Sequence, residues 1–189
     1  MALSAIALCS RALLKLGADG IASFDEGTAE AEVSANLYPS IRDALLSSHP
    51  WSFATGQAAL PKLAAAPVAD FANAFQLPAD FLRALSAGTG VRGRGIDYRL
   101  HEQRLHTDAD PVVLSYIFRP AESAFPPFFD QAVIARLAAE FCLPLTESTS
   151  RAEVLFKLAE QEFRRAKTID SQQDTTGGFD GFSLTEARA

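Results

Sequence analysis

The stretch from residue 30 to residue 55, EAEVSANLYPSIRDALLSSHPWSFAT, carries the strongest structural signal in the chain. Four apolar residues recur at every fourth position in it: Val33, Leu37, Ile41 and Leu45. This spacing places them along one face of a helix, with charged residues away from that face. The stretch therefore predicts one long amphipathic helix.

Prolines mark the course and the end of this helix. Pro39 predicts a kink or a helix restart, because proline lacks the backbone donor and its ring clashes with the preceding turn. His49-Pro50 predicts the end, because the residue before a proline is disfavoured in the α region. Trp51 and Phe53 follow directly. Together with Tyr38 they could stack on bases, but burial in the core is the better interpretation, since it stabilises by about 1.5–3 kcal/mol per side chain.

Two shorter signals precede the long helix. Residues 3–16 predict a first helix, with Ser4 as its N-cap and Gly17 in the left-handed position after its end. Its core-facing stripe is Ile6, Cys9, Leu13 and Leu16. Ser23-x-x-Glu26 has the form of a capping box and predicts the start of the second helix.

The middle of the chain changes from helical to strand periodicity. Residues 54–70 are rich in Ala and Pro and predict a connection with room for one strand near 56–60. Alternating apolar residues then predict strands in five segments, at 71–77, 81–85, 98–100, 104–107 and 112–118. We expect one small antiparallel sheet from these segments.

Helical periodicity returns at Pro126-Pro127, which can open a helix but not continue one. Phe129, Val133, Leu137 and Phe141 form the next stripe, and Ser150-x-x-Glu153 predicts the cap of a last helix. The predicted fold is α+β, mainly α. Residues 1–53 and 126–173 form a four-helix bundle, residues 54–125 an inserted β lobe, and residues 174–189 an extended, flexible C-terminal tail.

Composition sets broad limits. The chain has 189 residues, of which 48% are hydrophobic and 21% charged, as in ordinary globular proteins. It contains no apolar run of the ~20 residues that span a membrane and no recognisable signal peptide, so we expect no membrane partner. Cys9 and Cys142 fall on predicted helix faces and are interpreted as reduced core thiols.

Basic residues gather at one predicted loop. The net charge of −6, from 17 basic and 23 acidic residues, argues against broad binding to nucleic-acid phosphates. However, Arg92 and Arg94 alternate with glycines at the tip of a predicted turn, with Arg99 and Arg104 nearby. This loop is either a basic finger that touches phosphates or a neighbouring acidic ring, or a turn with solvated charges.

The sequence gives no support for catalysis. His106, Asp108 and Asp110 could in principle hold a metal or form an acid–base group, but a solvated hairpin with a turn at Asp110-Pro111 is the better interpretation. No serine elbow, phosphate-binding loop or zinc-protease motif is present. We therefore expect no enzyme activity, no cofactor and no metal.

The C-terminal segment 174–189 reads DTTGGFDGFSLTEARA. Phe179, Phe182 and Leu184 stabilise nothing in a glycine-rich terminus unless something covers them. Either the segment folds on a partner, which these three residues anchor, or it is a disordered tail.

Several of these features together resemble the tail tubular protein A family, the head-to-tail adaptors of short-tailed phages. The matching elements are Leu16-Gly17, Ile21-Ala22-Ser23, Asp25-Glu26, Leu37-Tyr38-Pro39, Arg42-Asp43, His49-Pro50-Trp51-Ser52-Phe53 and the segment FQLPADFLR at 75–83. The resemblance is looser over the C-terminal helices and absent from the last segment.

The resemblance implies a structural protein of the virion neck or tail, made in the host bacterial cytoplasm. Its expected partners are the portal protein, a tail tube or nozzle protein, further copies of itself in a ring of twelve, and double-stranded DNA that passes without sequence-specific binding. The C-terminal segment would reach the portal or a neighbouring copy. The alternative is a helical nucleic-acid-binding module that uses the Arg92–Arg104 loop, and a small metal-dependent hydrolase around His106 and Asp108 is a third reading.

Overall fold

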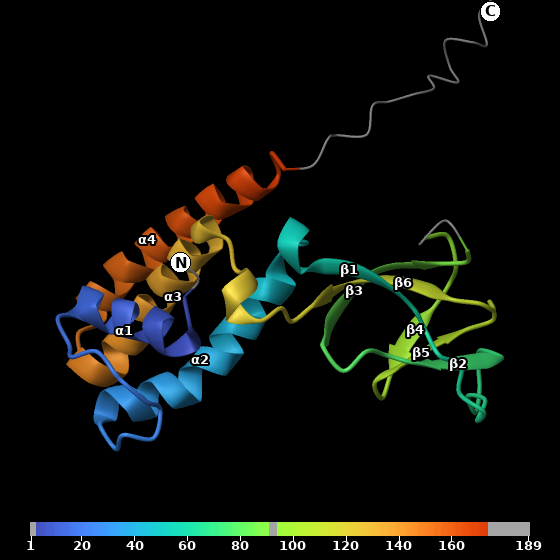
Figure 1. Ribbon diagram of the computed structural model, residues 1–189, viewed down its shortest axis with the longest axis horizontal. Helices are drawn as coiled ribbons and strands as arrows, with labels where there is room; N and C mark the ends of the chain where they lie inside the picture. Colours follow the sequence, from blue (N-terminus) through green and yellow to red (C-terminus); the bar gives the residue numbers. More distant parts are fainter. Residues whose placement is uncertain (1–2, 91–93, 174–189) are drawn as a thin grey trace, which may run out of the picture.

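The computed structural model describes residues 3–90 and 94–173. It is elongated, with a helical bundle at one end and a β lobe at the other (Figure 1). Helices account for 48% of the chain and strands for 18%, so the predicted α+β, mainly-α class is confirmed. The helices are α1 (Ala5–Leu16), α2 (Ala29–Ser48), α3 (Pro127–Thr146) and α4 (Thr149–Asp170), and the strands are β1 (Thr55–Ala59), β2 (Asn73–Gln76), β3 (Phe81–Gly88), β4 (Arg99–His101), β5 (Arg104–Thr107) and β6 (Val113–Phe118).

Helix α3 is the central element of the bundle. The predicted stripe of Phe129, Val133, Leu137 and Phe141 is fully buried. Alanines on the other sides of α3 are buried as well, so the helix is covered nearly all round. Because α1, α2 and α4 all pack against α3, the bundle consists of one inner helix and three outer helices.

Small side chains bring α4 close to α3. The buried apolar residues of α4 are Ala152, Ala159 and Ala166, seven positions apart, and Ala159 packs against Ala135 and Ala139 of α3. The larger apolar side chains of α4, such as Leu155 and Phe163, are only partly buried beside this contact. A close helix pair thus leaves bulky apolar groups on the flanks of α4.

Helix α2 buries a different face from the one that the four-residue spacing predicts. Ser34, Tyr38 and Leu46 are buried, whereas Val33, Leu37 and Leu45 are only partly buried; Ile41 is buried as predicted. The reason is geometric: a step of four residues overshoots one turn of 3.6, so such a stripe winds around the helix. Pro39 lies within one continuous helix, so of the two predicted alternatives, a kink or a restart, the restart is excluded.

The helix starts confirm some of the predicted caps and correct others. The Ser4 hydroxyl accepts the Ala7 N–H, and Gly17 is left-handed, as expected for α1. The Glu26 carboxylate does accept the Ser23 N–H, but Gly27 has φ +77°, so α2 begins only after its cap Thr28. Helix α4 is capped by Ser148 and not by Ser150, because α3 ends just before it.

The β lobe contains two small sheets, where the sequence predicted one. The strand orders are β1-β6-β3 and β2-β5-β4, both antiparallel. The two sheets share a core in which Phe75 and Leu105 of one meet Leu114 and Tyr116 of the other. Alternation predicts which residues face inward but not which strands pair, so the positions of the strands were predictable and their division into two sheets was not.

Enlarging the alanine contact between α3 and α4 is expected to destabilise the bundle. The substitution Ala159→Leu forces extra methylene groups into a close helix pair and lowers the free energy of unfolding by about 1–3 kcal/mol. The matched control is Ala35→Leu, at an exposed position of α2. Urea unfolding followed by circular dichroism measures both; equal midpoints for the two variants would contradict the close contact.

Candidate functional site

A buried aromatic cluster joins the bundle to the β lobe. Trp51, directly after α2, is fully buried, and its indole N–H donates to the Leu45 carbonyl at 3.0 Å. Its ring lies 5.0 Å from that of Phe129 on α3 and 5.7 Å from that of Phe163 on α4. Trp51 is therefore a core residue, as predicted, and three helices meet around it.

The last residue of α4 fixes this corner. Asp170 is 4% exposed, and its carboxylate accepts the hydroxyl of Ser52 at 2.6 Å and the Ser52 N–H at 3.1–3.2 Å. His49 Nε2 lies 3.7 Å from the same carboxylate. Burial lowers the pKa of His49, and the charge of Asp170 offsets only part of this. The end of α4 is thus tied to the residue that leads into β1.

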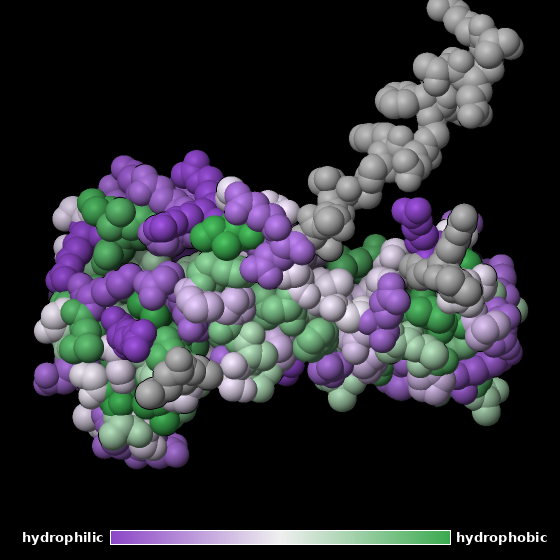
Figure 2. Space-filling model, turned by 45° about the horizontal axis from the view of Figure 1, so that its top comes forward, coloured by the Kyte–Doolittle hydropathy of each residue, from purple (hydrophilic) through white to green (hydrophobic). Residues whose placement is uncertain are grey.

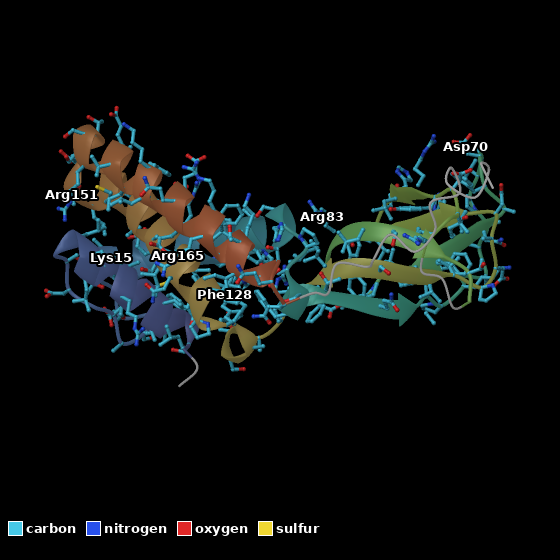
Figure 3. All side chains as sticks on the ribbon, turned by 90° about the horizontal axis from the view of Figure 1, so that it is seen from above. Lys15, Asp70, Arg83, Phe128, Arg151 and Arg165 are labelled. Atoms are coloured by element: carbon cyan, nitrogen blue, oxygen red, sulfur yellow. The ribbon has the colours of Figure 1, made fainter. Side chains whose placement is uncertain are left out.

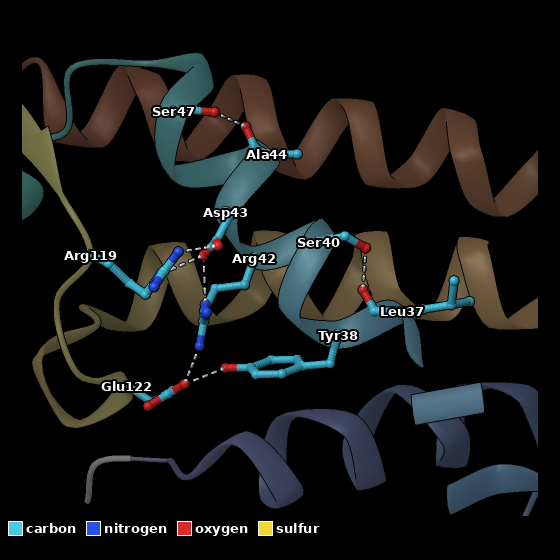
Figure 4. Close-up of polar contacts among 9 residues, drawn as sticks. All are labelled: Leu37, Tyr38, Ser40, Arg42, Asp43, Ala44, Ser47, Arg119 and Glu122. Carbon is cyan, nitrogen blue, oxygen red and sulfur yellow. Dashed lines mark hydrogen bonds and ion pairs between the residues drawn. The ribbon is translucent and has the colours of Figure 1, made fainter. Parts of the chain in front are cut away.

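A second polar contact ties the strand that leaves the lobe to α2 (Figure 4). Arg119, just after β6, forms a bidentate ion pair with Asp43, in which Nε and Nη2 donate to the two carboxylate oxygens at 3.0 and 2.6 Å. Arg42 bridges Asp43 at 2.9 Å and Glu122 at 3.0 Å, and the Tyr38 hydroxyl donates to Glu122 at 3.0 Å. We call these five residues the junction network. Bidentate arginine–carboxylate pairs fix geometry as well as charge, so both connections to the lobe are held.

The arginines and hydrogen-bond donors of the junction network stabilise the charges of its two carboxylates. Partial burial raises the pKa of Asp43, but Arg119 and Arg42 outweigh it and leave that pKa below its ordinary value. The pKa of Glu122 is lowered in the same way, with hydrogen bonds from its own backbone, Tyr38 and Arg42 overcoming burial. Both carboxylates are therefore held ionised in the folded chain.

Exposed apolar side chains lie mostly in the half of the bundle remote from the lobe. Five of the seven large hydrophobic residues that are exposed in the described part of the chain lie there: Leu14, Leu143, Val154, Phe156 and Leu158. Figure 3 shows Lys15 and Arg151 at this end and Asp70 at the opposite tip of the lobe. The Arg151 guanidinium donates to the Lys15 carbonyl, which joins α4 to α1 there. We call this region the apolar end.

A groove separates α2 from α4, and residues of α3 also line it. It encloses about 880 Å³, and its lining includes Leu37, Ile41 and Leu45 from α2 and Phe156 and Phe163 from α4. Figure 2 shows hydrophobic side chains exposed among charged ones on the bundle. We call this feature the interhelical groove. The stripe that the sequence assigned to the core thus lies partly at a surface groove.

The β4–β5 hairpin presents four basic side chains on one face. The register pairs Arg99 with His106 and His101 with Arg104, while Leu100 pairs with Leu105 on the other face. A pocket of about 370 Å³ lies against this face, and Asp70 on its rim pairs with Arg99 at 2.6 Å. Arg94 is exposed nearby in the sequence, and Arg92 lies outside the described residues. We call Arg99, His101, Arg104 and His106 the basic face. The sequence indicated both arginines as part of a basic loop, but it indicated His106 only as part of a metal or acid–base group.

The other candidate residues have structural partners. Asp110 pairs with Lys62 at 2.8 Å, and Asp108 accepts the Ala72 N–H at 2.8 Å. Within residues 3–90 and 94–173, no three His, Cys, Asp or Glu side chains gather as a metal site would require. Cys9 and Cys142 are buried free thiols, and burial raises the pKa of Cys9 to about 12.

The predicted anchors Phe179, Phe182 and Leu184 lie outside the described residues. In the described part of the chain, none of the helices has the length and apolar character that a membrane crossing needs. In comparisons with known proteins, no family model and no curated protein matches this chain.

The junction network predicts a specific acid sensitivity. Because the pKa values of Asp43 and Glu122 are lowered, their stabilisation is complete above the ordinary carboxyl value of about 4 and is lost as the pH falls below it. Asp43→Asn should therefore lower the unfolding free energy at about pH 7 but change it much less at about pH 3. Urea unfolding at both pH values measures this, with Asp25→Asn, at an exposed position, as the control. An equal loss for Asp43→Asn at both pH values would count against the network.

Proposed function

We propose that this chain is a structural head-to-tail adaptor of a tailed phage or phage-like particle, which forms a ring below the portal and continues the DNA channel. The motifs that resemble those of the tail tubular protein A family support this proposal. The apolar end supports the proposal on the structural side, because exposed apolar side chains that gather in one region mark interaction surfaces.

Ring formation needs two different faces on each copy. In a heterologous interface, one surface of a subunit meets another surface of the next, and repetition closes the ring. The apolar end supplies one such face, and the β lobe at the other end of the elongated body offers a separate one (Figure 1). The copy number of twelve follows from the resemblance alone.

The contacts between the bundle and the lobe suit a subunit of fixed shape. The junction network and the Asp170–Ser52 contact hold both strands that connect bundle and lobe. A ring can close only if every subunit has the same angle between its two contact faces. In this proposal, residues 174–189 serve as a tether to the portal or a neighbour through Phe179, Phe182 and Leu184, and a tail tube or nozzle protein binds below.

The net charge of −6 suits a protein that surrounds DNA without holding it. Double-stranded DNA passes through such a ring without sequence-specific contacts, because tight phosphate binding requires clustered lysines and arginines. The adaptor is not an enzyme in this proposal, and its work is done by assembly.

The apolar end gives a direct test of the proposal. Leu158, 49% exposed, should lie in an interface, so Leu158→Glu should abolish ring formation on the cognate portal while leaving the fold intact. Gln161→Glu, at an exposed position one turn along α4, is the control. Negative-stain images of each chain mixed with the portal provide the measurement. Absence of rings with the unmodified chain would overturn the proposed function. Normal rings with Leu158→Glu would show that the apolar end is not part of the ring interface.

The basic face favours a second candidate function, the nucleic-acid-binding module that the sequence left open. Two arginines and two histidines on one hairpin face could contact phosphates, although Asp70 already pairs with Arg99.

This second candidate predicts salt-dependent binding to DNA. Arg94→Ala combined with Arg104→Ala should weaken a gel shift of double-stranded DNA and flatten its salt dependence, because two phosphate contacts disappear. Arg165→Ala, at an exposed position on α4, is the control (Figure 3). A chain that gives no shift at low salt excludes this candidate.

A further inference from the structure

The interhelical groove is an apolar surface inside a charged border. Phe156 is 36% exposed. The Arg136 guanidinium lies over its ring, with the Cζ atom 5.1 Å from the centroid of the Phe156 ring. Arg136 in turn pairs with Glu140 at 2.7 Å, and both residues line the groove. The groove therefore presents ring faces and aliphatic side chains at its centre, with charges at its edge. This pattern suits a short peptide with apolar anchors and polar residues between them.

The chain continues for sixteen residues beyond the described part, and these residues begin shortly after α4, which lines the groove. Helix α4 forms one wall of the groove and ends at Asp170, which is fixed by Ser52. Counted from Gln173, Phe163 lies ten residues back, about 15 Å along the helix, and Phe156 about 26 Å. From Gln173, six extended residues reach Phe179 and cover up to about 20 Å. A chain that reverses direction after α4 therefore reaches the groove.

The spacing of the apolar residues in the segment also matches. The wall of the groove on α4 extends from Glu153 to Phe163, about 15 Å of helix. Phe179, Phe182 and Leu184 lie within six residues, and the five steps from the first to the last cover up to about 17 Å of extended chain. Length, starting point and anchor spacing thus agree on one occupant.

We propose that residues 174–189 fold back along α4 and insert Phe179, Phe182 and Leu184 into the interhelical groove of the same chain. Attachment to α4 favours this arrangement over binding to a second copy, because a short linker gives an effective concentration in the millimolar range. The contact does not depend on the proposed adaptor function. If that function holds, groove binding and portal binding compete for the same three side chains, so the free chain keeps its anchors covered until it meets the portal.

Disulfide trapping in the isolated full-length chain tests the proposal. Ser183→Cys places a thiol between two anchors, and Glu160→Cys places a second one at an exposed position that lines the groove. The native thiols of Cys9 and Cys142 are buried and give little background. Under mild oxidation at low protein concentration, we expect a disulfide within one chain. It is detected as a monomer on a non-reducing gel and as a joined peptide by mass spectrometry.

The matched control is Ser183→Cys with Arg165→Cys. Arg165 is exposed on α4 and lies nearer to the start of the segment, but it does not line the groove. Random encounter would favour the control, whereas docking should make the Glu160→Cys pair react about tenfold faster. Adding Phe179→Ser and Phe182→Ser should remove this advantage. Ser40→Cys, on the α2 wall, replaces Glu160→Cys if that variant does not fold.

Two outcomes would overturn the proposal. Equal rates for the groove pair and the control pair would show that the segment does not prefer the groove. Cross-linked dimers in place of monomers would assign the groove to a second copy of the chain. Because no portal is present in this experiment, a failure of the adaptor function cannot produce either result.

Discussion

The contact between Asp170 and Ser52 is the constraint on which the arrangement of the molecule depends. These residues are 118 positions apart, yet their side chains meet at 2.6 Å beside the buried Trp51. A buried carboxylate is costly unless donors compensate it, and here a hydroxyl and a backbone N–H do so. The contact joins the last residue of α4 to the first turn after α2. It thereby fixes where the lobe leaves the bundle and where the C-terminal segment begins.

The surfaces that remain open follow from the burial of α3. An inner helix that is apolar nearly all round requires three outer helices, and each of these covers α3 with only one face. Helices α2 and α4 pack on α3 more than on each other, which leaves the interhelical groove between them. The alanine contact brings α4 close to α3 and leaves Phe156 and Leu158 at the surface. The groove and the apolar end thus both result from the way in which α2 and α4 pack against α3.

The sequence predicted what local patterns determine. Phe129, Val133, Leu137 and Phe141 were assigned to the core because a strongly apolar helix repeats at short range, and the strands were found because alternation is local as well. Pairings between distant residues leave no such signal. Arg119 and Asp43 are 76 positions apart, so neither the junction network nor the division into two sheets could be predicted. The buried face of α2 was misassigned because a four-residue repeat winds around the helix, so that Leu37 and Leu45 lie partly at the groove.

The separation of the open surfaces bears on how the proposed functions relate. The apolar end lies at one end of the molecule, and the basic face, through Asp70, lies at the tip of the lobe (Figure 3). Because they do not overlap, the proposed contact with a neighbouring copy and the proposed contact with phosphates do not exclude each other. Asp43 and Glu122 stand between these ends and fix the angle at which the second surface is presented once the first is bound. A weakened junction would therefore leave each surface intact and change only their relative direction, which a ring tolerates less than a monomeric binding module does.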